Sequence, residues 1–487
     1  MTSIPAYIRQ NNEPHQDRPA LRYSDGKERI EITFRDFFDR VDRFAQGLLA
    51  LGVEPGDKVF LFADNSPRWL IADLGILRAG AISVPRGADT TPPEAEYILK
   101  HSGATVIVAA NPRLLDRIPT DDYPIKACIS LAGGRINVVS YDDLLDKGKG
   151  ETLPTVPDGV ATIVYTSGTT GPPKGVMLTH ENILANVKLC PPLIGVVPTD
   201  RCLSVLPSWH MFERTVEYII LAEGACLSYS SLRTLKADLM EEKPTLLPAV
   251  PRLYEGVQAG FYSKLEQRTG FGKKFATFLL NSSLKYSKLR RLAQGRLEDP
   301  RGQLKMSRGA ARVKSWFAAP FGMLGRAMVG KKVREAVGGN LRVAISGGGM
   351  LPLHLDIFLD ALGIGAYVGY GLTETSPVVT LRTPKRNVLG SIGAAVPQTE
   401  LRVTGPSGEA LPVGETGELE VRGPQVMPGY YNDEDATKAV LREDGWFRTG
   451  DLVQLTKAGD VLFTGRLKET IVLAGGENIE PNPIESR

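Results

Sequence analysis

The stretch Tyr165–Val176 reads YTSGTTGPPKGV and directly follows the apolar, β-branched run Val160–Val164, which predicts a buried strand. Its residues 166–171 are only hydroxyl-bearing residues and glycines, and Lys174 follows two prolines later. Glycines let backbone N–H groups turn toward an anion, hydroxyls add hydrogen-bond donors, and a lysine adds a mobile positive charge. The stretch therefore predicts a loop that holds a polyphosphate.

The pattern of this loop differs from the common P-loop. That motif needs adjacent Gly-Lys followed by Ser or Thr. Here Pro173 precedes Lys174 and Gly175 follows it. The alternative interpretation is a surface turn rich in glycine, serine and threonine that binds no ligand.

The string YTSGTTGPPKGV resembles the phosphate loop of the adenylate-forming (AMP-binding) enzymes, which include acyl-CoA synthetases, peptide-synthetase adenylation domains and luciferases. Three later stretches also resemble motifs of this family and occur in the family's order. They are YVGYGLTET at 367–375, WFRTGD at 446–451 and GRLKE at 465–469. The resemblance favours the branch of long-chain fatty acyl-CoA synthetases and acyl-ACP synthetases.

Composition is that of an ordinary soluble globular protein, with 42% apolar and 23% charged residues among 487. The length suggests about three domain-sized units. The four cysteines show no metal-binding spacing, which favours a reducing compartment. We find no charged-then-apolar signal at the start and no apolar run of the ~18 residues that a membrane span needs. We expect a cytoplasmic protein, or one that is peripheral on the inner face of a membrane.

Strands alternate with helices in the first part of the chain, which predicts an α/β fold with layered parallel sheets. The predicted helices are 33–51, 68–79 and 92–101, and the predicted strands are 58–63, 81–84 and 104–109. From Gly390 onward, short strands alternate with Gly/Pro turns, which predicts a small β-barrel subdomain. The resemblance implies the fold of the family's N-terminal domain.

We predict a large adenylation domain at 1–464. It would comprise α/β subdomains at about 1–155 and 156–388 and a β subdomain at 389–464. Residues 465–487 would be the hinge and a stub of the family's C-terminal lid domain, which we expect to be mostly absent. Without a lid lysine, we expect a weakly active enzyme.

The resemblance implies a role for each residue that matches a nucleotide-binding motif. The loop hydroxyls and Lys174 would hold the β- and γ-phosphates, and Thr373 would contact the α-phosphate. Tyr370 would stack on adenine, and Glu374, with Thr170, would hold Mg²⁺, since a carboxylate suits a hard cation. The predicted nucleotide-binding residues are Thr166, Ser167, Gly168, Thr169, Thr170, Gly171, Lys174, Gly347, Gly348, Gly349, Gly369, Tyr370, Gly371, Thr373, Asp451 and Arg466.

Asp451 would accept hydrogen bonds from both ribose hydroxyls, and Arg466 would reach the ribose or a phosphate. Lys468 would be the pivot between the large domain and the lid. The glycines Gly347–Gly349 follow a predicted strand at 341–346 and would lie beside the adenine.

His210 lies in LPSWHMFER at 206–214, a stretch that resembles the long-chain members of the family. A lone histidine is more often structural than functional. The resemblance implies a place beside the acyl carboxylate, so the predicted catalytic residues are Lys174, Thr373, Glu374 and His210. Glu213 and Arg214 are the alternative, structural pair in this stretch.

Residues 262–332 form a strongly basic segment with 17 Lys+Arg and 3 Asp+Glu, a net charge of +14. The rest of the chain then carries +3 − 14 = −11. Aromatic residues at helical spacing accompany these cations, which predicts a basic helical insertion for a membrane surface or an acidic partner. The alternative is an insertion that covers the enzyme's own core. We see no nucleic-acid-binding fold and expect no nucleic-acid partner.

The predicted reaction is the attack of a medium- to long-chain fatty acid on Mg·ATP, which gives acyl-AMP and pyrophosphate. CoA would then form the thioester. One alternative acceptor is acyl carrier protein through its phosphopantetheine, because Arg86–Thr91 (RGADTT) resembles acyl-ACP synthetases. A second alternative is a lidless adenylate- or lipid-binding module without turnover.

Overall fold

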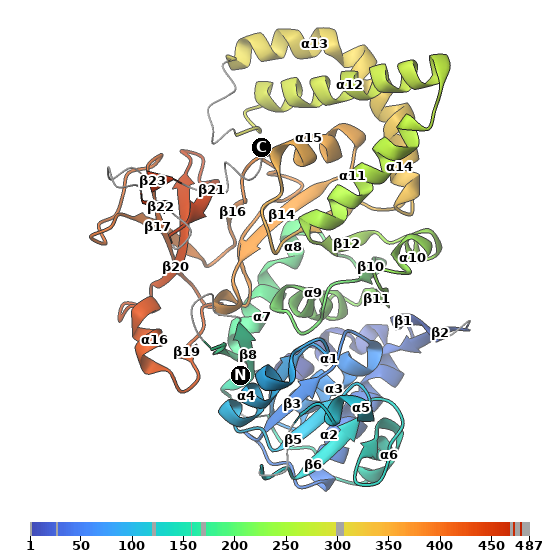
Figure 1. Cartoon of the computed structure of the whole chain (residues 1–487), viewed down its shortest axis with the longest axis vertical. Helices are drawn as coiled ribbons and strands as arrows, with labels where there is room; N and C mark the ends of the chain where they lie inside the picture. The colour runs from blue at the N-terminus through green and yellow to red at the C-terminus, as the bar shows by residue number, and fades with distance from the viewer. Residues whose placement is uncertain are drawn as a thin grey trace. The chain divides into compact units, whose positions relative to one another are not determined.

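The computed structural model describes residues 2–25, 28–118, 123–156, 158–166, 172–298 and 306–467, and the short strands 471–472 and 478–479. Five of the predicted loop residues, 167–171, and the predicted pivot Lys468 lie outside these ranges. The chain forms two compact units, shown in Figure 1. Unit 1 comprises Met1–Ser231, Leu372–Pro377 and Pro424–Leu441, and unit 2 comprises Leu232–Gly371, Val378–Gly423 and Arg442–Arg487.

Unit 1 contains an eight-stranded sheet in the order β19-β9-β8-β4-β3-β5-β6-β7. The strands from β8 to β7 pair in parallel, whereas β9 is antiparallel to both β8 and β19. Their bounds are β3 Lys58–Phe62, β4 Ile82–Arg86, β5 Val106–Ala109, β6 Ala127–Ser130, β7 Val139–Ser140, β8 Val160–Thr166, β9 Lys174–Thr179 and β19 Gly429–Tyr430. The parallel core confirms the predicted layered α/β fold.

The helices of unit 1 follow from amphipathic patterns with local caps. In α2, Phe34–Ala50, the Thr33 hydroxyl accepts a hydrogen bond from Asp36 N at 3.2 Å, which satisfies one free amide of the first turn. In α4, Pro92–Ser102, the chain leaves the helix at Gly103 with φ +72°, where glycine has no Cβ penalty. The other helices are α1 Ile4–Asn11, η1 Glu13–His15, α3 Pro67–Arg78, α5 Pro112–Leu115, α6 Tyr141–Lys147, α7 His180–Leu189, α8 Pro191–Ile194, α9 Met211–Ala222, η3 Thr373–Thr375 and α16 Glu434–Val440.

Four further strands of unit 1 pair with one another. They are β10 Arg201–Ser204, β11 Cys226–Tyr229, β1 Pro19–Asp25 and β2 Glu28–Thr33. β11 pairs in parallel with β10 and β1, and β1 is antiparallel to β2.

A buried ion pair joins the elements beneath the β8 strand. Arg214 on α9 and Asp73 on α3 are both 0% exposed, and Arg214 Nε lies 2.9 Å from Asp73 Oδ2. Arg214 Nη1 also donates to Thr162 Oγ1 of β8 at 2.8 Å. The structural pair of Arg214 with Glu213, the alternative for this stretch, is therefore wrong, and both Glu213 carboxylate oxygens lack a hydrogen-bond partner among the described residues. Adjacent residues of a helix do not face each other, so Arg214 reaches a partner on another element.

Unit 2 is built on the parallel strands β12 Leu246–Ala249, β13 Val343–Ser346 and β14 Ala366–Gly371. The strands β15 Val378–Leu381 and β16 Ala394–Ala395 continue this sheet antiparallel. A separate antiparallel sheet has the order β17-β18-β20-β21, at the place of the predicted β subdomain. Its bounds are β17 Glu400–Thr404, β18 Thr416–Arg422, β20 Phe447–Leu455 and β21 Val461–Arg466, and β22 Ile471–Val472 pairs with β23 Asn478–Ile479.

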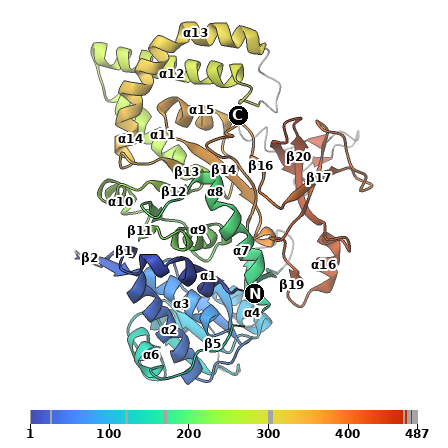
Figure 2. The same ribbon diagram turned by 180° about the vertical axis from the view of Figure 1, so that it is seen from behind.

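The basic segment is helical, as predicted. Its two long helices, α12 Gly270–Ala293 and α13 Arg308–Gly325, pack along each other, and α12 packs on α15 Leu353–Leu362 (Figure 2). The close approach of α13 to α12 needs a glycine at position 325, because a Cβ there would lie 2.2 Å from Leu279 O. The remaining helices are α10 Leu235–Glu242, α11 Pro251–Glu266, η2 Arg326–Gly330 and α14 Lys331–Ala336. No helix in the described part of the chain is long and apolar enough to span a bilayer.

Removal of Asp73 tests the buried ion pair. Asp73→Ala leaves the Arg214 guanidinium buried without its carboxylate, so we expect the free energy of unfolding to fall by about 3–5 kcal/mol. Chemical denaturation followed by circular dichroism measures this change. The control is Asp39→Ala, which breaks the exposed Arg43–Asp39 pair and should cost about 0.5 kcal/mol or less. Equal losses in the two variants would contradict the role of Asp73.

Candidate functional site

The β8–β9 hairpin positions the predicted phosphate loop. Thr166, the last residue of β8, is the register partner of Lys174, the first residue of β9, so the two flank residues 167–173. Below them, the Tyr165 hydroxyl lies 2.7 Å from His101 Nδ1. A Cβ on Gly175 would lie 2.8 Å from Ile163 Cγ2, so only glycine fits here without displacement of a neighbour. Packing therefore fixes both ends of the loop.

Tyr430 connects Lys174 with Glu374. The Lys174 ammonium lies 5.0 Å from the centroid of the Tyr430 ring, within the range of a cation–π contact. The Tyr430 hydroxyl donates a hydrogen bond to Glu374 Oε1 at 2.9 Å. Burial, and after it the Glu374 charge, raises the pKa of Tyr430, which keeps the phenol protonated and able to donate. One tyrosine thus orients both a cation and a carboxylate.

A short turn holds Thr373 and Glu374 in place. The 3₁₀ turn η3 contains both residues, and Leu372 N donates to Thr375 Oγ1 at 3.0 Å. Met427 N donates to Glu374 O at 2.8 Å, and Asn186 of α7 donates to Thr375 O at 3.2 Å. Backbone and side-chain bonds therefore fix this turn from both sides.

His210 is the N-cap residue of α9, and its ring packs at a tilt of 34° against that of its neighbour Trp209. The rings of His210 and Trp209 have centroids 3.7 Å apart, and the Arg86 guanidinium lies 5.0 Å from the Trp209 ring. Arg86 in turn donates to Tyr165 O at 3.0 Å, at the end of β8. Desolvation by the surrounding protein, and after it the Arg86 charge, lowers the pKa of His210 below its usual range. The imidazole is therefore neutral at pH 7 and offers a hydrogen bond, not a charge.

In unit 2, two of the predicted nucleotide-binding residues, Tyr370 and Arg466, contact a third, Asp451. The Tyr370 hydroxyl donates to Asp451 Oδ2 at 2.6 Å, and Arg466 Nε lies 2.9 Å from Asp451 Oδ1. Asp451 is only 1% exposed. Desolvation, and after it the Asp451 charge, raises the pKa of Tyr370, so its phenol stays protonated. The aromatic ring, the carboxylate and the guanidinium form one connected group.

Glu418 on β18 holds the turn that carries Asp451. Its carboxylate accepts hydrogen bonds from Gly450 N at 3.2 Å and from Arg448 Nε at 3.0 Å. Asp451 N donates to Thr449 Oγ1 at 3.1 Å. These contacts preform the turn before any ligand is present.

The predicted glycines lie at strand ends of unit 2. Gly347 N donates to Ala249 O at 3.2 Å directly after β13, and Gly348 has φ +70°, a conformation that favours glycine. Gly369 and Gly371 lie in β14, where the pairing with β15 shifts register between Tyr370 and Gly371. At the carboxyl ends of parallel strands, glycines place no side chain in the way of a ligand.

The predicted residues thus form two groups. Unit 1 joins Lys174 and Glu374 through Tyr430, with Thr373 in the same turn as Glu374, and unit 2 joins Tyr370, Asp451 and Arg466. In the described ranges, no three His, Cys, Asp or Glu side chains are grouped as a metal site. The predicted metal residue Thr170 lies outside those ranges.

Sequence reasoning missed Tyr430, Glu418 and Arg86. Tyr430 lies 56 residues from Glu374, and Glu418 lies 32 residues from Gly450. A signal existed only for Tyr430, whose Pro428-Gly-Tyr-Tyr431 string places two aromatic residues after a turn. For Glu418 and Arg86, only the folded sheet brings the partners together.

Curated relatives cover nearly the whole chain. The protein "Probable acyl-activating enzyme 16, chloroplastic" of Arabidopsis thaliana is 37% identical, over 99% of this chain and 73% of the relative. "Long-chain-fatty-acid--[acyl-carrier-protein] ligase AEE15, chloroplastic" of the same plant is 36% identical, over 99% of this chain and 72% of the relative. "Long-chain-fatty-acid--CoA ligase FadD15" of Mycobacterium tuberculosis is 30% identical, over 94% and 73%.

Solved structures share the fold. ATP-bound MatB from Rhodopseudomonas palustris has a TM-score of 0.75 at 24% identity, over 100% of this chain and 83% of that chain. A Mycobacterium tuberculosis fatty acyl CoA synthetase has a TM-score of 0.71 at 24% identity, over 99% and 82%. The family described as AMP-binding enzyme matches residues 8–431. Together with the identity to the Arabidopsis relatives, this match shows that the chain belongs to the AMP-binding enzyme family.

Proposed function

We propose that this protein is an AMP-forming ligase that activates long-chain fatty acids to acyl-AMP, releases pyrophosphate and transfers the acyl group to the thiol of CoA. The observation that carries the proposal is the placement of Lys174 and Glu374 on one tyrosine, Tyr430, beside the phosphate loop of an AMP-binding enzyme. The names of relatives that ligate long-chain fatty acids to CoA or acyl carrier protein support the choice of substrate.

The first step needs charge stabilisation more than it needs a protein nucleophile. A fatty acid carboxylate oxygen forms a bond to the α-phosphorus of ATP, and the bond to the pyrophosphate oxygen breaks. We propose that Lys174 and the loop hydroxyls neutralise the pyrophosphate, that Thr373 contacts the α-phosphate, and that His210 lies beside the acyl carboxylate. Fixed donors and charges lower the barrier because they need no reorganisation during the reaction.

Glu374 fits a role as the protein ligand of Mg²⁺. Magnesium in phosphoryl-transfer enzymes usually takes one or two carboxylates and completes its shell with substrate phosphate oxygens and water. A single oriented carboxylate, with no further acidic cluster in the described ranges, matches that pattern. In unit 2, we propose that Tyr370 stacks on adenine while Asp451 and Arg466 take the ribose.

In the second step, the thiol sulfur attacks the acyl carbonyl carbon and AMP leaves. Acyl carrier protein is the second candidate acceptor. The sequence is 36% identical to an acyl-carrier-protein ligase, and its 262–332 segment carries a net charge of +14, which suits an acidic carrier. We expect kcat/KM for one acceptor to exceed that for the other, in assays with palmitate, ATP and either CoA or holo acyl carrier protein. If neither CoA nor holo acyl carrier protein supports AMP release, the ligase proposal is overturned in favour of a binding module.

Tyr430→Phe tests the tyrosine that joins Lys174 and Glu374. The variant keeps the ring under the ammonium but removes the donor to Glu374, a charge-assisted hydrogen bond of about 1.5–3 kcal/mol. We expect palmitate-dependent ATP–pyrophosphate exchange to fall by about 10- to 100-fold, and the Mg²⁺ concentration for half-maximal rate to rise. Tyr431→Phe is the matched control, because it removes a hydroxyl from the adjacent tyrosine and keeps the ring. An unchanged exchange rate in Tyr430→Phe would contradict the role of its hydroxyl.

We also propose that the basic insertion contacts membrane surfaces. Several of its large apolar residues are exposed, with Phe271 at 81%, Trp316 at 73% and Phe317 at 69%. Such residues, flanked by cations, are typical of interfacial helices. Arg290 and Arg291 are excluded from this surface because both pair with Asp360. Lys285 and Lys288 on α12 are exposed and are the better candidates.

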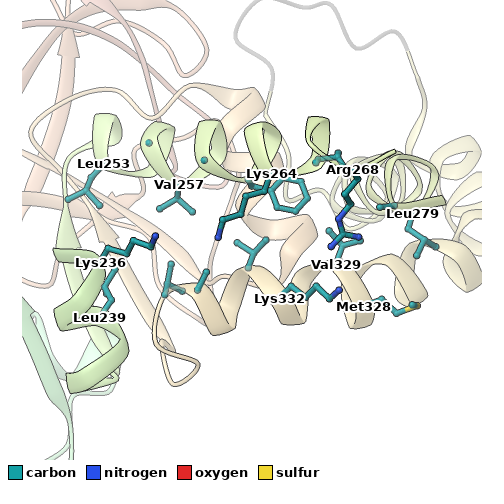
Figure 3. Close-up of a pocket in the computed structure, with 18 of the residues that line it drawn as sticks. Lys236, Leu239, Leu253, Val257, Lys264, Arg268, Leu279, Met328, Val329 and Lys332 are labelled. Carbon is teal, nitrogen blue, oxygen red and sulfur yellow. The ribbon is translucent and has the colours of Figure 1, made fainter. Parts of the chain in front are cut away.

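A groove of about 960 Å³ next to this surface supports the same proposal. Apolar side chains of α10, α11, α12 and α14 line most of it, and Figure 3 shows Lys236 and Lys264 directed into the space beside α11. An apolar groove with a cationic rim favours molecules that have an acyl chain and an acidic head. Fatty acids held in a membrane have this chemistry.

Vesicle sedimentation tests the membrane proposal. We expect binding to vesicles of mixed phosphatidylglycerol and phosphatidylcholine, and weaker binding to phosphatidylcholine alone, because cations near anionic lipid contribute about 1 kcal/mol each. Lys285→Gln with Lys288→Gln and, separately, Trp316→Ser with Phe317→Ser should each reduce binding. Val413→Ser, at an exposed apolar residue outside the insertion, is the control. If neither double variant changes sedimentation, the insertion is not a membrane contact.

A further inference from the structure

A second pocket of unit 2 is lined by arginines. It has a volume of about 400 Å³ and lies among α12, α15 and the starts of β13 and β14. Five of its lining residues are arginines and one is an aspartate, Asp360, so the formal charge of the lining is 5 − 1 = +4. The arginines are Arg290, Arg291, Arg296, Arg326 and Arg342. The pocket is polar and strongly cationic.

The single carboxylate is already engaged. Arg290 Nη2 lies 3.0 Å and Arg291 Nε 3.1 Å from the oxygens of Asp360. By contrast, Arg296 donates to Lys385 O at 3.3 Å and Arg326 donates to Asp360 O at 3.2 Å. Backbone carbonyls satisfy hydrogen bonds but carry no net charge, so these two contacts leave the charges of Arg296 and Arg326 unneutralised.

Two observations indicate that this cluster does more than hold helices together. Arg290 Nε is buried and has no hydrogen-bond partner among the described residues, which is unusual for a charged donor. Burial lowers the pKa of Arg326, and the neighbouring Arg290, Arg334 and Arg291 guanidiniums lower it further against the opposing effect of Asp360. Like charges so close repel one another, and an anion between them would relieve the repulsion.

The pocket is separate from the nucleotide-contacting residues of unit 2. Arg342 immediately precedes β13, and Gly365 immediately precedes β14. Gly347–Gly349 and Tyr370 lie at the opposite, carboxyl ends of these same parallel strands. A strand of four residues spans about 13 Å. The arginine pocket thus opens at the other edge of the sheet.

We propose that this arginine pocket binds a dianionic phosphate monoester, at a site distinct from the adenylate site. Guanidinium groups present paired N–H donors in a plane, which match two phosphate oxygens at once. The Tyr367 side chain also lines the pocket and adds a hydroxyl. The phosphate has two sources: free phosphate, or the 3′-phosphate of a ribonucleotide such as that of CoA. The second source rests on the function proposed above.

Isothermal titration distinguishes these sources. The probes are inorganic phosphate, adenosine 3′,5′-bisphosphate and AMP, added to the Asp451→Ala variant so that ribose binding at Asp451 does not contribute. We expect adenosine 3′,5′-bisphosphate to bind at least about tenfold tighter than AMP, a difference of about 1.4 kcal/mol. Saturable binding of inorganic phosphate without this preference would indicate the free-phosphate source and also support the site.

The decisive comparison uses Arg296→Gln with Arg342→Gln, which leaves the Asp360 pairs with Arg290 and Arg291 intact. The charge-matched control is Arg312→Gln with Lys314→Gln on exposed positions of α13. The pocket variant should lose the phosphate-dependent affinity, and the control should keep it, at equal melting temperatures. Binding that is absent, or unchanged in the pocket variant, overturns the proposal. Loss of acyl carrier protein binding alone would also overturn it and favour a protein-docking surface.

Discussion

The buried guanidinium of Arg214 holds together the elements from which the phosphate loop begins. Arg214 bonds Asp73 of α3 and Thr162 of β8 from its position on α9, and both charged residues are fully buried. A buried charge is costly unless it is paired, so an arrangement of these elements that separated Arg214 from Asp73 would be strongly disfavoured. Because β8 runs on to Thr166, that arrangement also fixes where the loop begins.

The groups that would meet ATP are held in place before any ligand arrives. Tyr430 orients Lys174 and Glu374, and Glu418 holds the turn that carries Asp451. Arg86 links the end of β8 to the tilted ring pair of Trp209 and His210. Preorganised charges stabilise a transition state more than mobile ones, since they lose no energy to reorientation. The structure therefore suits a reaction in which the protein's main task is alignment and charge stabilisation.

Local patterns predicted the elements well because their causes are local. The helix α2, expected at 33–51, spans Phe34–Ala50. The strand–helix alternation correctly indicated a parallel sheet. Motif resemblance predicted the residues of the candidate site, but it did not predict their supports. Tyr430 and Glu418 act on partners that are distant in sequence, which no periodicity or spacing reveals.

The alternative pair Glu213–Arg214 shows the limit most clearly. Adjacent opposite charges suggest a pair, but neighbouring residues of a helix do not face each other, and Arg214 instead bonds Asp73, which lies 141 residues away in the sequence. The basic segment shows a second limit. Its charge of +14 suggests one continuous basic surface, but the fold divides it between exposed cations on α12 and α13 and arginines that line a separate, open pocket. Charge counts alone cannot separate these two roles.

The most direct test follows an oxygen atom. Palmitate labelled with ¹⁸O in its carboxylate is incubated with the protein, ATP, Mg²⁺ and CoA, and the AMP is analysed by mass spectrometry. If the carboxylate attacks the α-phosphorus and the thiol then attacks the acyl carbon, each AMP formed carries one ¹⁸O. AMP without the label, or label found in pyrophosphate, would contradict formation of an acyl-adenylate and with it the proposed activity.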